Sequence, residues 1–241
     1  MKLATWNLER GGRTQGAREA QEEILAELRA DVVVLTEPPA SYKTTSGVVT
    51  SPRLRKNGTA EPEAWVAIVG SSVEPVDFDV PYKHTAVAAR ASVGGLIVII
   101  YGAVLPWLAV TSHADELVEE GEDSFAVFKR VLAEQAKDIA DLRKRYGSPV
   151  IWAGDFNQTV SGPNWGGSND RRDLLIETIN SLELEPWNGK ADHAMNGMCA
   201  VDLICGPKEC FVLPQGRIDP VRGKLAMSDH AGYWVELTAR Q

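Results

Sequence analysis

The chain has 241 residues, of which 44% are hydrophobic and 24% are charged, values typical of an ordinary globular protein. The formal net charge of −8 excludes a protein that holds nucleic acid mainly through an overall positive charge. The three cysteines include no Cys-x-x-Cys pair, which argues against a disulfide framework or a structural zinc site.

The first half of the chain alternates short apolar runs with one helical pattern. A strand is predicted over Lys2–Trp6, and the run at Asp31–Thr36 is typical of a strand buried on both faces. Between them, apolar residues at spacings of three and four predict an amphipathic helix, with a face made of Ala17, Ala20, Ile24 and Leu28. Three further strands are predicted over Trp65–Val69, Thr85–Arg90 and Gly95–Tyr101.

The second half contains two predicted helices and three predicted strands. One helix is expected to begin at an N-cap Ser124 and to end near Gly147, and another to begin at an N-cap Asp170. The strands are predicted over Val150–Ala153, Val201–Cys205 and Tyr233–Leu237. Because the helices do not follow every strand, a doubly wound parallel sheet fits poorly, and two packed sheets with helices outside fit better.

No repeat, low-complexity tract or long linker interrupts the chain, so we expect a single domain over residues 1–241. No apolar run reaches the roughly 18 residues of a membrane span. The N-terminal residues lack the apolar stretch of a signal peptide. We therefore expect a cytoplasmic protein without a membrane partner, and no obligate protein partner is evident.

Polar residues follow several predicted strands at the point where each strand ends. Asn7 and Glu9 follow the first strand, Glu37 follows the second, and Asp155 and Asn157 follow the strand that ends in Val-Ile-Trp-Ala-Gly. Loops at the ends of strands on a rigid sheet are favoured places for active sites. Any one of these residues alone would be an ordinary turn residue.

Three more polar residues occur near the last strands. Asp229 and His230 precede the final strand, and Asp202 lies inside an apolar strand, where a carboxylate should have a partner. Orienting a histidine is a familiar use of such an acid. Together these residues suit phosphodiester cleavage, which needs a metal to offset phosphate charge, a positioned water and a stabilised leaving oxygen. Oxygen ligands favour Mg²⁺, and the four histidines show no zinc-binding spacing with cysteine.

Five segments resemble the endonuclease/exonuclease/phosphatase superfamily, which includes exonuclease-III-like abasic-site endonucleases, pancreatic-type deoxyribonucleases, inositol polyphosphate 5-phosphatases and neutral sphingomyelinases. Each segment is short, but the five occur in the family's order and span nearly the whole chain. They are Thr5–Glu9 (TWNLE), Val34–Glu37 (VLTE), Gly154–Asn157 (GDFN), Val201–Ile204 (VDLI) and Ser228–His230 (SDH).

The resemblance implies a four-layer α/β sandwich in which helices flank two central mixed β-sheets. It also implies a metal site for Mg²⁺, with Mn²⁺ as the alternative. Glu37 would be the principal ligand, with Asn7 and Asp229 beside it, and Glu9 occupies the place where some relatives have a second acid near the metal.

The resemblance assigns further roles to residues of the same motifs. Asp155 would orient or deprotonate the attacking water, and Asn157 would help to hold the phosphate or the nucleophile. His230 would contact the scissile phosphate, oriented by Asp202. Tyr101 fits a family tyrosine that touches the phosphate or the leaving group.

One departure from the family pattern puts the role of Tyr101 in doubt. In the abasic-site endonucleases the segment after the tyrosine ends in Pro-Asn, whereas here the chain continues to Pro106-Trp107. His113 is a candidate for the second histidine of the deoxyribonuclease-like branch, although a structural or solvent-facing histidine is the simpler interpretation.

The sequence specifies the residues that contact the substrate less clearly than it specifies the metal ligands. Arg217, Arg222 and Lys224 lie just before the last motif and would grip phosphates if their loop folds over the cleft; the alternative is a solvated loop. Trp107 and Trp165 could stack a base near the site, or could belong to the core.

The sequence therefore predicts a metal-dependent phosphoesterase that hydrolyses phosphodiester bonds in DNA, RNA or nucleotides. Two alternatives remain. The first is a phosphatase or phosphodiesterase for a small phosphoester, such as a sugar, inositol or lipid head group, which the acidic composition mildly favours. The second is a binding scaffold without catalysis, against which the intact set of acids, amide and histidine argues.

Overall fold

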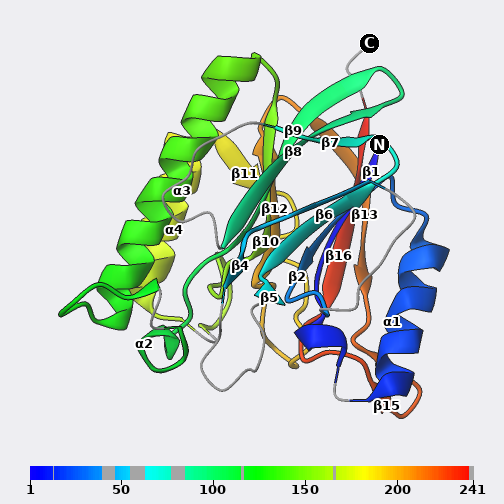
Figure 1. Ribbon diagram of the computed structural model, residues 1–241, viewed down its shortest axis with the longest axis horizontal. Helices are drawn as coiled ribbons and strands as arrows, with labels where there is room; N and C mark the ends of the chain where they lie inside the picture. The colour runs from blue at the N-terminus through cyan, green and yellow to red at the C-terminus, as the bar shows by residue number, and fades with distance from the viewer. Residues whose placement is uncertain are drawn as a thin grey trace.

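The structure, a computed structural model, describes residues 1–12, 14–39, 47–54, 63–76, 85–114, 117–164 and 167–238. Two six-stranded β-sheets pack face to face, and helices cover both outer sides (Figure 1). The expected four-layer α/β sandwich with two mixed sheets is confirmed.

The first sheet has the strand order β13-β16-β1-β2-β6-β3. Its strands are β1 (Lys2–Asn7), β2 (Val32–Thr36), β3 (Gly47–Thr50), β6 (Val66–Gly70), β13 (Phe211–Ile218) and β16 (Gly232–Thr238). β1 runs parallel to β2 and antiparallel to β16. The ends of β1 and β2 and the start of β16 therefore lie at the same edge of this sheet.

The second sheet has the strand order β11-β12-β10-β9-β8-β7. Its strands are β7 (Val73–Pro75), β8 (Ala86–Val93), β9 (Leu96–Val104), β10 (Val150–Asp155), β11 (Leu184–Pro186) and β12 (Asp202–Pro207). β10 runs parallel to β9 and antiparallel to β12. Asp155, the last residue of β10, therefore pairs with Asp202, the first residue of β12.

The remaining elements are helices and short strands. The helices are η1 (Glu9–Gly11), α1 (Gln15–Leu28), α2 (Val110–His113), α3 (Ser124–Tyr146) and α4 (Asn169–Ser181). Two small strand pairs join β4 (Arg53–Leu54) to β5 (Glu63–Ala64) and β14 (Val221–Arg222) to β15 (Leu225–Ala226). No helix among the described residues is long and apolar enough to cross a membrane.

The two predicted N-caps are wrong by one and two residues. Asp123, not Ser124, caps α3, because its side chain accepts hydrogen bonds from the backbone N–H groups of Phe125 and Ala126. Ser168, not Asp170, caps α4. Both true caps have the extended backbone that a capping residue needs, and the predicted residues lie within the first helical turn.

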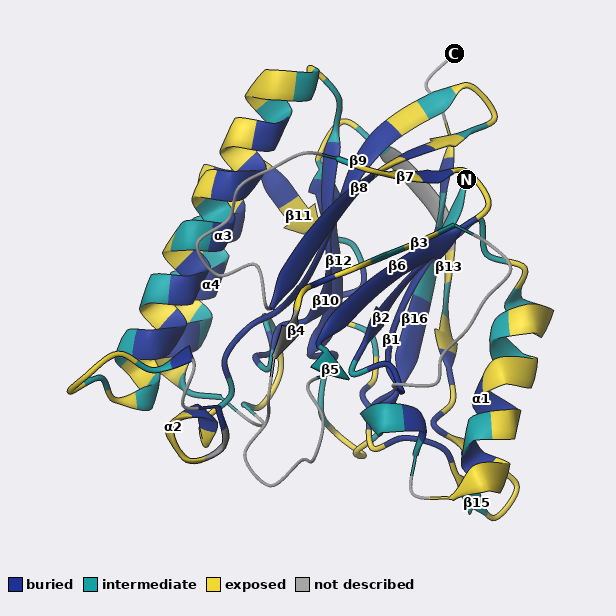
Figure 2. Ribbon diagram, viewed as in Figure 1, coloured by how far each residue is buried: buried dark blue, intermediate teal, exposed yellow. Residues whose placement is uncertain are grey.

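The main core lies between the sheets and under α3 and α4, while a second cluster lies between α1 and the outer face of the first sheet. Strands at the centre of both sheets are buried, and the outer surfaces of the helices are exposed (Figure 2). Gly102 on β9 faces the first sheet: a Cβ atom there would lie 2.9 Å from Val66 and 3.1 Å from Val34. The sheets approach each other closely at this point.

Candidate active site

Two hydrogen bonds join the sheets at the edge where the strand ends meet. Asn7 Nδ2 donates to Asp155 Oδ2 at 2.9 Å, and His230 Nδ1 lies 2.6 Å from Asp202 Oδ2. Asn7 and His230 come from the first sheet, whereas Asp155 and Asp202 come from the second. All four side chains are buried, so four distant segments of the chain converge on one polar cluster.

The turn after β10 presents Asp155 and Asn157 together. The backbone N–H of Asn157 donates to Asp155 Oδ1 at 2.9 Å, and Asn157 Nδ2 donates to the carbonyl of Leu105 at 3.0 Å. Gly154 is required before them, because its φ is +140° and a Cβ would lie 2.0 Å from the carbonyl oxygen of Ala103.

Ser228 links the loop before β16 to the end of β1. Its hydroxyl donates to the carbonyl of Asn7 at 2.8 Å and accepts from the backbone N–H of His230 at 3.0 Å. Trp6 Nε1 also donates to the carbonyl of His230 at 3.0 Å. Asp229 Oδ1 lies 3.8 Å from His230 Nε2. Ser228 belongs to the predicted Ser-Asp-His segment, but no role was predicted for it.

Glu37 and Glu9 lie beside this cluster. A carboxylate oxygen of Glu37 lies 3.3 Å from Arg10 Nε, and Arg10 is also 3.1 Å from Glu63. Burial raises the pKa of Asp202, and the charge of Glu37 adds to this effect, so the two carboxyl groups interact. The backbone N–H of Glu9 donates to Asn7 Oδ1 at 2.9 Å.

Four residues at the site have a left-handed backbone, which is uncommon outside glycine. Their φ angles are +47° at Glu9, +59° at Arg10, +46° at Glu37 and +49° at Asn157. Such conformations cost of order 1–3 kcal/mol each and persist only where the surroundings impose them. Here the surroundings include Glu37 N–H bonded to the carbonyl of Trp65 and Arg10 N–H bonded to the carbonyl of Glu37, both at 2.9 Å.

Burial and neighbouring charges shift the pKa values of Asp155 and His230 by different amounts. Burial raises the pKa of Asp155 to about 6. Burial opposes a charge on His230, but the carboxylates of Asp202 and Asp155 outweigh it and raise the pKa of His230 to about 10. His230 is therefore an imidazolium at neutral pH, held by Asp202.

His193 also belongs to the cluster, although it was not predicted as a site residue. A nitrogen of each histidine, His193 and His230, and a carboxylate oxygen of Asp202 lie within 4.8 Å of one another. Burial and the charge of His230 lower the pKa of His193 to about 4, so it is neutral. Its Nδ1 accepts from the backbone N–H of Met195 at 3.1 Å. No spacing in the sequence signals this position, which is set by the loop before β12.

The structure does not bring Tyr101 to the cluster. Tyr101 is fully buried, and its hydroxyl donates to Asp138 on α3 at 2.8 Å, on the outer side of the second sheet. The side chain of His113 and all of Trp165 lie outside the described residues.

The three predicted phosphate-gripping residues have different surroundings. Arg217 lies 3.4 Å from Asp219, and its charge contributes to lowering the pKa of His193, so it lies near the cluster. Arg222 instead pairs with Glu23 of α1 at 2.6 Å. Lys224 is exposed in the turn between β14 and β15.

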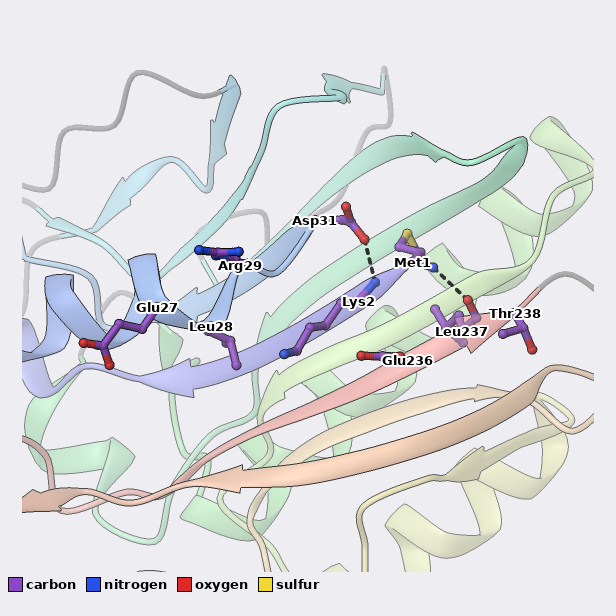
Figure 3. A pocket seen from close by; sticks show the side chains of 9 residues that line it. All are labelled: Met1, Lys2, Glu27, Leu28, Arg29, Asp31, Glu236, Leu237 and Thr238. Carbon is purple, nitrogen blue, oxygen red and sulfur yellow. Dashed lines mark hydrogen bonds between the residues drawn. The ribbon is translucent and has the colours of Figure 1, made fainter.

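A hollow of about 730 Å³ lies at the opposite end of β1, and is not part of this site (Figure 3). It is lined by Lys2, the first residue of β1, whereas Asn7 is the last. Lys2 N–H donates to Asp31 Oδ2 at 2.7 Å, and the N-terminal amine donates to the carbonyl of Leu237 at 2.8 Å. A strand of six residues separates the two ends by roughly 17 Å.

Solved structures with this architecture are numerous. A 3′-5′ exonuclease (NExo) from Neisseria meningitidis matches with a TM-score of 0.70 and 19% identity over 98% of this chain and 99% of that one. The endonuclease domain of TRAS1, a telomere-specific non-LTR retrotransposon, matches with a TM-score of 0.66 and 14% identity, over 100% and 99% of the two chains. An endonuclease/exonuclease/phosphatase family protein from Leptotrichia buccalis matches at 0.64 and 15%, over 99% and 100%. This protein has the endonuclease/exonuclease/phosphatase fold.

No protein-family model matches the chain, and no curated protein matches it in sequence.

The side chains at the site have the chemistry to hold a divalent metal ion. Asn7, Glu37 and Asp229 offer the oxygen atoms that Mg²⁺ prefers. Asp202 Oδ1 is buried and has no hydrogen-bond partner among the residues that the structure describes.

The histidine pair is a poorer metal site within this fold. Two nitrogen donors suit Zn²⁺ better than Mg²⁺. The 2.6 Å separation of His230 and Asp202 is that of a hydrogen bond, which a metal ion would have to replace. The Asp202–His230 pair is therefore better suited to holding a proton than to holding a metal ion.

Proposed function

We propose that the protein is a Mg²⁺-dependent phosphoesterase that hydrolyses phosphodiester bonds in nucleic acid or nucleotides, with Mn²⁺ as an alternative metal. The observation that carries this proposal is the pair of hydrogen bonds between the sheets, Asn7 to Asp155 and Asp202 to His230. These contacts support a site in which a metal-binding half and a proton-transferring half lie at the same edge of the sandwich.

The metal-binding half is formed by residues of the first sheet. Glu37 would be the principal ligand, and Asn7, Asp229 and Glu9 would complete the site directly or through water. The left-handed backbone at Glu37 and Glu9 turns these residues out of the regular strand and helix geometry. When bound, a divalent ion offsets the negative charge that develops on the phosphate oxygens.

The other half positions water and phosphate. Asp155 accepts hydrogen bonds from Asn7 and from the Asn157 backbone, which fix its carboxylate so that it can orient a water molecule and take its proton. Asn157 holds the turn and contacts the phosphate or the nucleophile. His230, protonated and fixed by Asp202, donates to a phosphate oxygen as negative charge develops there.

The solved structures support the choice of reaction. Their names include an exonuclease and an endonuclease, and NExo from Neisseria is also described as a 3′ phosphatase bound to a product DNA hairpin. Each of those activities breaks a phosphoester bond. Identity below 20% carries no substrate across to this chain, so the reaction class is the part of the proposal that they support.

A phosphatase or phosphodiesterase for a small phosphoester is the second candidate. The observation that favours it is the pairing of cations near the site with acids, Arg10 with Glu37 and Glu63 and Arg217 with Asp219. Together with the net charge of −8, this pairing leaves little positive charge for a long nucleic acid backbone.

The proposal is tested by hydrolysis of bis-p-nitrophenyl phosphate and of plasmid DNA with Mg²⁺ or Mn²⁺. We expect chelation of the metal to abolish turnover, and Glu37→Ala, Asp155→Ala and His230→Ala each to lose at least about 100-fold in kcat/KM. Glu185→Ala, which removes an exposed acid on β11, is the matched control and should retain wild-type rates.

Two results would contradict the assignment. Near-normal rates in the Asp155 or His230 variant would remove the role given to that residue. If a broad panel of phosphoesters gives no turnover above the Glu37→Ala background, the protein is a binding scaffold.

A further inference from the structure

A stack of two tryptophans lies beside the proposed metal-binding residue. The rings of Trp65 and Trp107 have centroids 5.2 Å apart and an interplanar angle of 27°. Trp65 is 1% exposed, whereas Trp107 is partly exposed. The surface that the stack offers to solvent therefore belongs to Trp107.

Hydrogen bonds place this stack between the two halves of the site. The carbonyl of Trp65 accepts the backbone N–H of Glu37 at 2.9 Å. On the other side, Leu105, two residues before Trp107, accepts a hydrogen bond from Asn157 Nδ2 and donates its N–H to the carbonyl of Asp155. Trp107 is thus attached to Glu37 through Trp65, and to the Asp155 turn through the chain.

The position of Trp65 is itself fixed. The Arg10 guanidinium carbon lies 4.8 Å from the Trp65 ring centroid, and the same side chain pairs with Glu37 and Glu63. A buried indole in contact with a paired guanidinium has little freedom to move. Trp107 therefore packs against a rigidly held indole, that of Trp65. This support lowers the conformational entropy that is lost when the ring of a ligand stacks on Trp107.

We propose that Trp107 is the stacking platform for a nucleobase attached to the phosphate that is cleaved. This inference rests on the proposed function and names its substrate class as nucleotides or unpaired strands. Arg10, Arg217 and Arg222 are each paired with acids, so they contribute little to a phosphate grip. Stacking supplies affinity that does not depend on free cations, and every base has a face that can stack.

The test compares two esters that share a p-nitrophenolate leaving group. One is the p-nitrophenyl ester of thymidine 5′-monophosphate, which carries a base, and the other is ethyl p-nitrophenyl phosphate, which carries none. We expect the wild type to prefer the nucleoside ester in kcat/KM. Trp107→Ala should reduce that preference about tenfold, mainly through KM, and Trp107→Phe should retain most of it.

Trp234→Ala is the matched control for this comparison, and the comparison also distinguishes stacking from a purely structural role of Trp107. Trp234 is also partly exposed but contacts Lys2 on another part of the first sheet, so Trp234→Ala should leave the preference unchanged. If Trp107 acted only by supporting Trp65 and Glu37, its removal would reduce hydrolysis of both esters by the same factor. An equal loss, or no loss, overturns the proposal.

A direct binding measurement separates this inference from the proposed function. Thymidine 5′-monophosphate should quench tryptophan fluorescence in the wild type, and the quenching should be lost in Trp107→Phe. Suppose that the wild type hydrolyses the ethyl ester, that Glu37→Ala does not, and that neither a base preference nor quenching appears. The proposed phosphoesterase function would then be supported, and the stacking role of Trp107 would be wrong. If neither ester is hydrolysed but quenching depends on Trp107, then Trp107 does stack on a nucleobase, and the proposed hydrolysis is wrong.

Discussion

Asp138 on α3 has a carboxyl group that is buried against the second sheet. It is 7% exposed, and it accepts the hydroxyl hydrogen bond of Tyr101. Burial raises the pKa of Asp138 to about 7 from an ordinary 3.8. The folded protein therefore binds a proton on Asp138 more tightly than the unfolded chain does. Between about pH 4 and pH 7 this group makes the free energy of unfolding fall as the pH rises.

Asp138→Asn should remove this part of the pH dependence. At pH 8 we expect the variant to be about 2 kcal/mol more stable than the wild type, since each pKa unit corresponds to ~1.4 kcal/mol and burial of the amide offsets part of the gain. Near pH 4, where Asp138 is protonated in the folded wild type, the variant should lose this advantage and become the less stable of the two, because the cost of burying the amide remains. Urea denaturation at both pH values measures it, with Asp173→Asn, at an exposed position on α4, as the control. A variant that is less stable at pH 8 would contradict the raised pKa.

Tyr101 shows why sequence alone can assign a residue to the wrong side of a strand. Side chains alternate between the faces of a strand, and Gly102 contacts Val66 and Val34 of the first sheet. Tyr101 must then face α3. A run of apolar residues in a strand buried on both faces does not reveal which face each residue takes. His193 could not be found for a related reason, because its place beside His230 depends on the loop before β12.

At the scale of elements, α1 joins two loops of the site. Gln21 on its buried face donates from Nε2 to the carbonyls of Leu8 and Met227, at 2.9 and 2.7 Å. Leu8 follows Asn7, and Met227 precedes Ser228. One side chain therefore holds together the end of β1 and the approach to β16.

Gln21→Met should weaken this connection while filling similar space. It leaves the carbonyl of Met227 without the donor that Gln21 supplies, whereas the carbonyl of Leu8 keeps the backbone N–H groups of Gly11 and Gly12. We expect a loss of about 2 kcal/mol in the free energy of unfolding. We also expect kcat to fall by roughly tenfold, because Asn7 and His230 lose a common support. Gln15→Met, at an exposed glutamine of the same helix, is the control. If the two variants have equal kcat and equal urea midpoints, Gln21 has no positioning role.

Elements with strong apolar runs or clear helical spacing were predicted within a few residues, and others were missed. Val32–Thr36 and Val150–Asp155 are buried along their whole length, which produces an unbroken apolar signal. β13 was missed because it contains Pro214 and Gly216, which are typical of turns. Gly216 instead permits a close approach of Trp234, within 2.6 Å of a Cβ position. That contact lies on another strand and cannot be read from the local sequence.

At the scale of the whole molecule, the spacing of the two sheets determines whether the site forms. The metal-binding residues are on the first sheet, and Asp155 and Asp202 are on the second. Gly102 lies at a point where the two sheets approach each other closely. An added side chain there must push Val34, Val66 and Ile68 away, and the sheets with them.

Gly102→Val should therefore affect activity more than stability. Overpacking should cost about 1–3 kcal/mol in the free energy of unfolding, which leaves a folded protein if the wild type has ordinary stability. The catalytic rate should fall by more than tenfold, because the hydrogen bonds between the sheets lengthen. Gly16→Val on α1, where a Cβ meets nothing within 4 Å, is the control. Thermal unfolding and kcat measured on the same samples test this; a folded variant with normal kcat would show that the site tolerates sheet separation.

The four left-handed residues at the site have a consequence for selection experiments. Glycine adopts that backbone more readily than glutamate does, so a screen for heat resistance alone should favour Glu9→Gly or Glu37→Gly. The survivors would tolerate higher temperature and lose the functional groups that those positions present. Stability and catalytic turnover therefore place opposite demands on the same few positions. Directed evolution for thermal stability alone would yield an inactive protein unless activity were also measured in every round.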